Sequence, residues 1–509
     1  MRKFSIDDFF HHHLSAFLTC LLLTLLCSCN VPDPVPTATS TPVYTATPVP
    51  PTPTATRIPT ATPTPLPDYL TIAPEELSGT TITLQFSPNE NVQFVLEDLV
   101  RQFNDENPYG INVKAEAVFS KDELANQVKS AQTDLVIADS SWLRSINTEK
   151  DLYLELSPFL SDPSLGLSGE NITPIMSVMM ETENKSGKFF ALPLWTEPAF
   201  LFYNKTWAIE LGFPETPADL SALAEQACAA GRANYAEKDE GKHGTGGWII
   251  SSDPEDVMSW LLVFTQNDET PGDLIRKDSG DVFENSGAWL RNLYDNGCAW
   301  NSRIREPYDY FANRYALFYS GTYSDAKRQY NAFDQSQEHS QDNWDLIVYP
   351  TRTKGSASVP RIYADTVSVA VMSSKDDKTI NAAWRFLRWL YQEDHAAKLS
   401  LAALGWPVQD SDEITKLYRN SGEDKLYQTL SYRQYLANSD TDENWLTDQR
   451  ILSDGFAYIF NPSAKPEDIP DIWEQIGSLI AEINSVNNLS QSSNGEGLKE
   501  TGENNETKH

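Results

Sequence analysis

The chain is poor in the residues that most often carry metal or nucleophilic chemistry. Cysteine occurs 5 times and histidine 7 times in 509 residues. Between residues 78 and 486 the histidines are His243, His339 and His395, which are far apart in the sequence. No G-x-S-x-G, H-E-x-x-H or phosphate-loop motif occurs. These absences argue against triad hydrolases, zinc enzymes and metal-specific binding proteins, and we expect neither a cofactor nor a metal site.

Positive charge is also scarce. Lys and Arg number 39 against 72 Asp and Glu, which gives a formal net charge of -33. Binding to phosphate backbones or to anionic lipid headgroups requires clustered basic residues. The composition therefore predicts no nucleic-acid partner.

The N-terminus contains an apolar run, residues 14–26, that is short for a permanent membrane helix. It follows the basic pair Arg2 and Lys3 and ends in Leu26-Cys27-Ser28-Cys29, which resembles the bacterial lipobox. This pattern predicts a signal peptide at 1–28 and a lipid on Cys29, which would hold the protein at the extracytoplasmic face of the cell membrane. An ordinary cleaved signal and a chance cysteine cluster are the alternatives.

Two segments have compositions that cannot form a core. Residues 31–67 are mostly Pro, Thr and Ala, so we expect a semi-rigid tether within 29–77 that reaches roughly 100 Å when fully extended. Residues 487–509 are rich in Asn, Ser, Gly and Glu, and we expect them to be disordered. The folded body is then 78–486, long enough for two lobes.

Two cysteines remain once the signal and the lipidated residue are set aside. Cys228 and Cys298 would face an oxidising compartment, and we predict that they form a disulfide. Two separate buried thiols are the alternative.

The body opens with alternating strand and helix patterns. Strands are expected at 80–86, 111–118 and 134–139, and a helix at 92–103. A second helix should begin near Ser120, where Ser-Lys-Asp-Glu offers a capping box. The unbroken apolar run at 135–138 is typical of a parallel strand buried on both faces. The order predicts an α/β fold.

Ligands of open α/β sheets bind beyond the carboxyl ends of the strands. The residues that follow the third strand are Asp139, Ser140, Ser141 and Trp142. We therefore expect them to face a binding site.

Several further segments resemble a known family in order and spacing. They are Phe103-Asn104, Asn107 to Val113, the strand DLVIAD at 134–139, ALPLWTEPAFLFYN ending at Asn204, and the segment Trp384 to Leu390, marked by AWRFL. Together they resemble the extracellular solute-binding proteins of ABC sugar importers, the maltose-binding-protein-like group, across essentially all of 78–486. The resemblance implies binding without catalysis.

The same resemblance implies a fold. It is a two-lobed, periplasmic-binding-protein-like α/β fold with discontinuous lobes and interlobe crossing strands at 192–203 and 366–371. The N-terminal lobe would hold 78–198 plus 364–415, and the C-terminal lobe 199–363 plus 416–486. The implied partners are a carbohydrate ligand and the importer's permease subunits, and we expect a monomer.

A sugar site combines aromatic rings, which stack on the C–H faces of a pyranose, with polar groups that pair with its hydroxyls. On this basis the candidate ligand-binding residues are Asp139, Ser140, Ser141, Trp142, Trp195, Glu197, Trp248, Ser320, Thr322, Tyr323, Tyr363, Asp365 and Trp406.

Each candidate also has an ordinary structural interpretation. A Trp in a large core more often packs than recognises a ligand, and an isolated carboxylate in an acidic protein is usually solvated. A surface glycosidase would likewise line a cleft with aromatics and two carboxylates. A structural adhesin would explain the lipid and the tether but not the alternating strands and helices, and a peptide or polyol could replace the sugar.

Overall fold

The computed structural model describes residues 66–87, 90–147, 152–167, 184–185, 188–251, 253–265, 269–270, 272–273, 280–301, 306–353, 359–437 and 444–496. The expected signal peptide, Cys29, the tether up to residue 65 and the last residues, 497–509, lie outside this part of the chain.

In the described part of the chain ten strands form one sheet: eight follow the order β2-β1-β3-β11-β6-β9-β7-β8, and β10 and β12 both pair with β6. A separate hairpin pairs β4 with β5. The strands are β1 (Thr81–Phe86), β2 (Asn112–Ala117), β3 (Leu135–Asp139), β4 (Asn184–Lys185), β5 (Lys188–Phe189), β6 (Leu192–Asn204), β7 (Gly246–Ile250), β8 (Ala299–Asn301), β9 (Ala316–Thr322), β10 (Trp344–Ile347), β11 (Ala364–Val371) and β12 (Trp406–Pro407).

Each end of this path is a small parallel sheet. In the first lobe β1 pairs in parallel with β2 and β3, as the alternating and buried apolar patterns predict. Residues 135–138 of β3 are all buried, which confirms a strand covered on both faces. In the second lobe β7 lies between β8 and β9, parallel to both.

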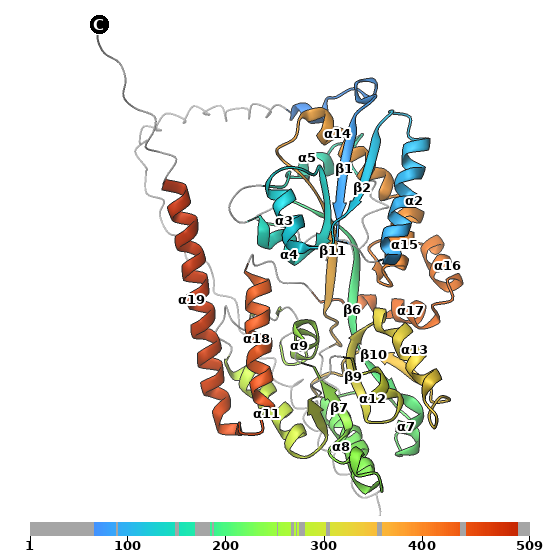
Figure 1. Cartoon of the computed structure of the whole chain (residues 1–509), viewed down its shortest axis with the longest axis vertical. Helices are drawn as coiled ribbons and strands as arrows, with labels where there is room; N and C mark the ends of the chain where they lie inside the picture. Colours follow the sequence, from blue (N-terminus) through green and yellow to red (C-terminus); the bar gives the residue numbers. More distant parts are fainter. Residues whose placement is uncertain are drawn as a thin grey trace, which may run out of the picture. The chain divides into compact units, whose positions relative to one another are not determined.

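The long strand β6 joins the two lobes. Its first half pairs with β11 and β12, and its second half with β9 and β10, all antiparallel. Figure 1 shows β6 passing from the first lobe into the second. Twelve of its 13 residues are buried, which explains its nearly continuous apolar sequence. The expected crossing at 192–203 is confirmed.

Helices cover both sheets. Those of the N-terminal half are α2 (Glu90–Glu106), α3 (Lys121–Lys129), α4 (Ser140–Ile146), α5 (Ser157–Leu160), α7 (Lys205–Glu210), α8 (Leu220–Ala236) and α9 (Pro254–Leu261). The later helices are α11 (Gly280–Asp295), α12 (Tyr308–Ala312), α13 (Ala326–Gln335), α14 (Asp377–Leu390), α15 (Glu393–Ala402), α16 (Asp412–Asn420), α17 (Asp424–Thr429), α18 (Trp445–Ile459) and α19 (Ile469–Glu496).

Local signals explain several helix starts. Ser120 accepts a hydrogen bond from the backbone N–H of Glu123, so the expected helix start at Ser120 is confirmed. At α9, Pro254 occupies the first turn, where its missing N–H costs nothing. None of the described helices is long and apolar enough to cross a membrane.

The folded region differs from the expected 78–486 at both ends. Tyr69, Leu70 and Ile72 pack on the first-lobe core, and Asn381 donates a hydrogen bond to the carbonyl of Tyr69. The packed part of the chain therefore begins before residue 78, with the apolar residues that follow the Pro-rich stretch.

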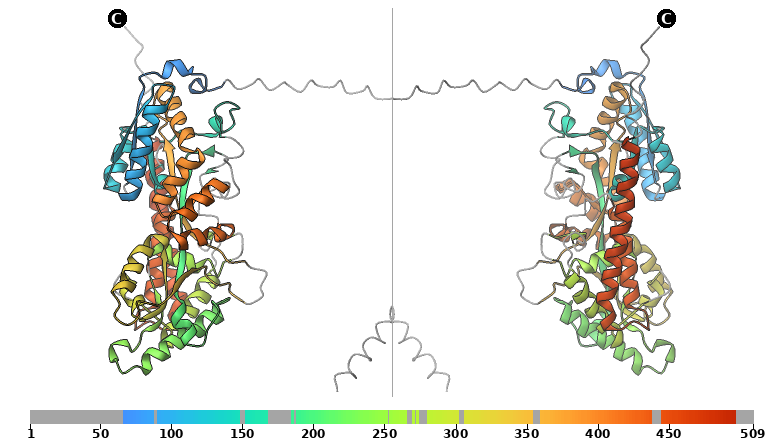
Figure 2. Two further views of the ribbon diagram at one scale, coloured as in Figure 1. Left: turned by 90° about the vertical axis from the view of Figure 1, so that its right-hand side faces the viewer. Right: turned by 90° about the vertical axis from the view of Figure 1, so that its left-hand side faces the viewer.

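At the other end α19 continues to Glu496, into the segment expected to be disordered. Extending a helix that is already formed costs little, even for Asn and Ser. The earlier part of α19, which is red in Figure 2, lies along α11 and α18.

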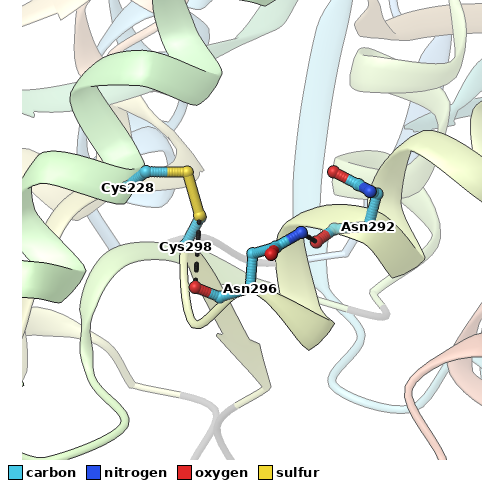
Figure 3. Close-up of a disulfide and its surroundings, with 4 residues drawn as sticks. All are labelled: Cys228, Asn292, Asn296 and Cys298. Atoms are coloured by element: carbon cyan, nitrogen blue, oxygen red, sulfur yellow. Dashed lines mark hydrogen bonds between the residues drawn. A yellow bond between two sulfur atoms is a disulfide. The ribbon is translucent and has the colours of Figure 1, made fainter.

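The predicted disulfide joins Cys228 and Cys298 (Figure 3). It links α8 to the segment between α11 and β8, and Cys298 is buried in the second-lobe core. The chain is tightly packed here: a Cβ on Gly247 would lie 1.7 Å from the carbonyl oxygen of Cys298. Glycine is therefore required at this position for close backbone packing.

Candidate ligand-binding site

Four carboxyl groups from both lobes meet beside the crossing strand. We call Asp139, Glu197, Glu255 and Asp365 the acidic cluster. Glu197 and Asp365 are directly opposite on β6 and β11, and Asp139 ends β3 opposite Val367 of β11. Glu255, in the first turn of α9, hydrogen-bonds Asp365. The antiparallel register of β6 and β11 thus places two carboxyls together, and α9 brings a third.

The surroundings of Glu197, Glu255 and Asp365 favour the protonated form of each carboxyl. Burial raises the pKa of Glu197 to about 7, although the indole N–H of Trp195 donates to its carboxylate at 3.1 Å. Burial and the neighbouring Glu255 raise the pKa of Asp365 well above its ordinary value. Solvent reaches the side chain of Glu255, but the protein packed around it partly desolvates the carboxyl, and this desolvation raises its pKa as well. Accessibility combined with enclosure is typical of a cleft.

One lysine reaches the cluster from the first lobe. The Nζ of Lys121, in the first turn of α3, lies 2.7 Å from Oδ2 of Asp139. Burial opposes the charge of Lys121, but the attraction of Asp139, Glu255 and Asp365 outweighs it and raises the pKa. A side chain of the first lobe therefore faces α9 of the second.

A cavity of about 740 Å³ adjoins the cluster on the second lobe. It lies at the carboxyl ends of the parallel strands β7, β8 and β9, where α/β folds bind ligands. Its lining is polar and acidic: Ile249, Ile250, Ser251, Asp253, Glu255, Asp256, Asn301, Glu306, Pro307, Tyr308, Tyr319, Ser320, Gly321, Thr322, Ser324, Asp325 and Arg328. Glu255 belongs to both the cavity and the acidic cluster, so the two form one site.

Two of the predicted site residues line this cavity. Ser320 accepts a hydrogen bond from the hydroxyl of Tyr349 at 2.6 Å, and the Thr322 hydroxyl lies 2.6 Å from that of Ser324. Asp139, Glu197 and Asp365 are in the acidic cluster. The structure thus brings five of the predicted polar residues to one site.

The predicted aromatic residues are all buried. Their exposed fractions are 8% for Trp142, 5% for Trp195, 1% for Trp248, 1% for Tyr323, 5% for Tyr363 and 0% for Trp406. Trp195 and Tyr363 touch the site through hydrogen bonds to Glu197 and Asp365. Trp142 packs with Leu143 in a first-lobe core. Direct ligand contact by these rings stays a prediction.

Three of these rings lie in packed cores away from the cavity lining. Trp248 packs against Trp289, with ring centroids 6.0 Å apart. The Tyr323 hydroxyl donates to Glu423 at 2.5 Å, and the Trp406 indole N–H donates to Thr429 at 2.9 Å. The glycines before Trp248 suggested a ligand loop, but they also allow the close packing at the disulfide.

Ser140 and Ser141 follow Asp139 at the start of α4. The hydroxyl of Ser140 pairs with that of Ser368 at 2.8 Å and is buried. Ser141 is half-buried. Ser140 therefore links the start of α4 to β11.

The sequence reasoning missed several residues of the site. Lys121, Glu255 and Asp256 were not singled out. The strand-end rule could have found Glu255 and Asp256, because Ser-Ser-Asp-Pro-Glu-Asp directly follows β7.

Two lobes with parallel sheets, a strand shared between them and a polar site where they meet define a two-lobed binding protein. Residues 98–416 match the family model of bacterial extracellular solute-binding proteins. The chain belongs to this family, which acts outside the cytoplasm. No curated protein matches the chain in sequence.

Solved structures share the fold at low sequence identity. A sugar-binding protein from Xanthomonas citri is 15% identical, with a TM-score of 0.64, covering 80% of this chain and 99% of that one. The cyclic alpha-maltosyl-1,6-maltose binding protein of Arthrobacter globiformis is 14% identical, with a TM-score of 0.62 and coverage of 79% and 98%. An ABC substrate-binding protein of Listeria monocytogenes, in complex with cycloalternan, is 17% identical, with a TM-score of 0.55 and coverage of 79% and 99%.

Proposed function

We propose that this protein captures a carbohydrate between its two lobes and delivers it, unchanged, to an ABC importer. The observation that carries the proposal is the single polar site formed by the acidic cluster and the adjoining cavity, with residues from both lobes. Carboxyls and hydroxyls in such a site can pair with several sugar hydroxyls at once. The sugar ligands named for the structural neighbours agree with this chemistry.

Aromatic contacts would come from the edge of the site. Phe119 is 83% exposed and stands two residues before Lys121, whose ammonium faces the cluster. Tyr308 lines the cavity, and its hydroxyl donates to Asp325 at 2.5 Å. An exposed ring costs free energy in water and is available to stack on a pyranose. These two rings are our candidates for stacking, beside the buried aromatics predicted from the sequence.

We further propose that the protein acts as a monomer, held to the membrane by a lipid on Cys29. The lipobox-like sequence and the Pro-rich segment after it support the anchor. The lobe division proposed from the resemblance, 78–198 plus 364–415 and 199–363 plus 416–486, is supported by the pairing of β6 with different strands in its two halves.

A thermal-shift screen of the full chain against neutral and charged carbohydrates tests the proposal. A ligand present at a hundred times its dissociation constant stabilises the folded state by about 2.7 kcal/mol, which raises the unfolding midpoint measurably. Failure of every carbohydrate to raise it would contradict the proposal.

Hydrolysis is the second candidate, because a carboxyl whose pKa is raised to about 7 has the property of a general acid. Glu197 and Asp365 also stand opposite each other on β6 and β11. If the protein only binds, its best ligand is recovered unchanged after prolonged incubation. Sustained product formation that disappears in Glu197→Gln would instead favour a glycosidase.

A further inference from the structure

The site is acidic on both lobes. Of the described residues that line the cavity, Asp253, Glu255, Asp256, Glu306 and Asp325 are acidic, and only Arg328 is basic. The adjoining cluster adds three more carboxyls and is approached by Lys121. A neutral sugar requires no such excess of carboxyls.

Both basic side chains already have acidic partners. Arg328 pairs with Glu306 at 3.6 Å, and Lys121 pairs with Asp139 at 2.7 Å. Within the described part of the chain, Glu197, Glu255, Asp256 and Asp365 form no ion pair with Lys or Arg. The carboxyls at the centre of the site therefore have no directly paired cation, because Lys121, which attracts Glu255 and Asp365, is itself paired with Asp139.

A second feature of the cavity points to a ligand. Tyr319 lines the cavity, is 1% exposed, and its hydroxyl has no hydrogen-bond partner among the described residues. Its ring is stacked on that of Phe202, with centroids 4.3 Å apart. A buried hydroxyl without a partner is costly. Asp256 and Asp325 lie near it and act on it electrostatically.

We propose that the ligand is a carbohydrate bearing a protonated amino group, with the ammonium held by Glu255 and Asp256 and a hydroxyl held by Tyr319. This rests on the proposed capture of a carbohydrate and specifies its class. The ammonium supplies a cation directly beside Glu255 and Asp256, and its three N–H donors can bond to more than one carboxyl. A cavity of about 740 Å³ suits a saccharide rather than a single metal ion.

The hydrogen bond between Glu255 and Asp365 agrees with this assignment. Two adjacent carboxyls can share a proton when no cation is present, because they cannot both be ionised at low cost. A bound ammonium would replace that proton and let both carboxyls ionise. Binding should then release protons, and it should weaken as salt concentration rises.

The test compares β-1,4-linked trisaccharides that differ only at the second carbon of each ring. One carries amines (glucosamine units), one acetamides and one hydroxyls (glucose units). Calorimetric titration of the full chain at neutral pH should show the amine form binding at least about tenfold more tightly than the other two. Glu255→Gln and Asp256→Asn should remove this advantage. Glu413→Gln, which removes a surface charge paired with Lys416 on α16, is the matched control and should keep it.

The other outcomes separate the two proposals. Equal or tighter binding of the hydroxyl or acetamide form overturns the amine assignment and leaves carbohydrate capture intact. Binding of calcium alone that depends on Glu255 also overturns it, in favour of a metal site. If no carbohydrate of any charge binds, both proposals fail together. Circular dichroism of each variant, which should match the wild type, checks that it is folded.

Discussion

At the scale of single residues, the position of an aromatic ring separates packing from recognition. Trp248 is 1% exposed inside the second-lobe core. We expect Trp248→Ala to lower the free energy of unfolding by about 3–5 kcal/mol, because it leaves a cavity. If the ring also stacks on the ligand, affinity falls by about 1–3 kcal/mol as well. Denaturation and titration of the same preparation measure both, and unchanged affinity assigns the ring to packing alone.

Phe119 should behave in the opposite way. Its ring is 83% exposed, so Phe119→Ala should change the free energy of unfolding by less than about 0.5 kcal/mol. If it stacks on a sugar, affinity should fall by about 1 kcal/mol or more. Phe94→Ala is the control, since Phe94 is 68% exposed on α2. Equal affinities of the two variants would remove Phe119 from the site.

The raised pKa of Glu197 makes stability depend on pH. Its folded value is about 7, against an ordinary value of 4.5, so the folded state holds the proton more tightly. This stabilisation is complete below about pH 4.5 and is lost as pH rises through about 7. Without ligand, the free energy of unfolding should fall between about pH 5 and pH 8. Urea denaturation should show a smaller fall for Glu197→Gln, and an identical fall would contradict the assignment.

At the scale of elements, the disulfide restrains the second lobe. It closes a loop with a sequence separation of 70 between α8 and β8. Replacing both cysteines by Ala should lower the free energy of unfolding by up to about 4 kcal/mol in the chain-entropy model. Reduced wild-type protein, measured in parallel, should match the variant. Two freely alkylated thiols in unreduced protein would show that the bond does not form.

Elements could be predicted from the sequence where one local pattern determines them. The apolar run at 135–138 predicts a buried parallel strand, and the apolar stretch at 192–203 supports the crossing, because burial on both faces requires apolar residues at every position. Ser120 predicts a helix start because its side chain can cap the first turn. The chemistry of the site was only partly predictable. Glu197 and Asp365 were found because they lie on the crossing strands, whereas Glu255 and Lys121 meet them only through tertiary packing.

The aromatic residues show the same limit. Trp406 stands between a glycine and a proline, and Tyr323 follows Gly321 by two residues, as residues of ligand loops often do. In the fold, their polar atoms bond to Thr429 and Glu423, which are distant in sequence. Periodicity cannot tell a ring that packs from one that faces a cleft, because both occur near strand ends.

At the scale of the whole molecule, the anchor can be tested apart from the binding site. We expect Cys29→Ala to release the protein from membranes or to block its processing, because the lipid is the proposed hold on the membrane. Fractionation of cells that express either form measures this. A variant that stays processed and membrane-bound would contradict the anchor.

Closure of the lobes is the mechanical consequence of a site that both lobes build. A ligand that contacts both favours the closed arrangement in proportion to its higher affinity for it. X-ray scattering on the full chain should therefore give a smaller radius of gyration with ligand than without. An unchanged radius at saturation would mean that the lobes do not close.

The central claim, that one solute is held by both lobes, is tested most directly by calorimetric titration of the best carbohydrate into two variants. Asp139→Asn changes the first lobe at the end of β3, and Asp256→Asn changes the second lobe at the start of α9. Each should weaken binding of the same ligand by about 1.4 kcal/mol or more, which is about tenfold. Affinity that changes in only one variant, or in neither, would contradict a site shared between the lobes.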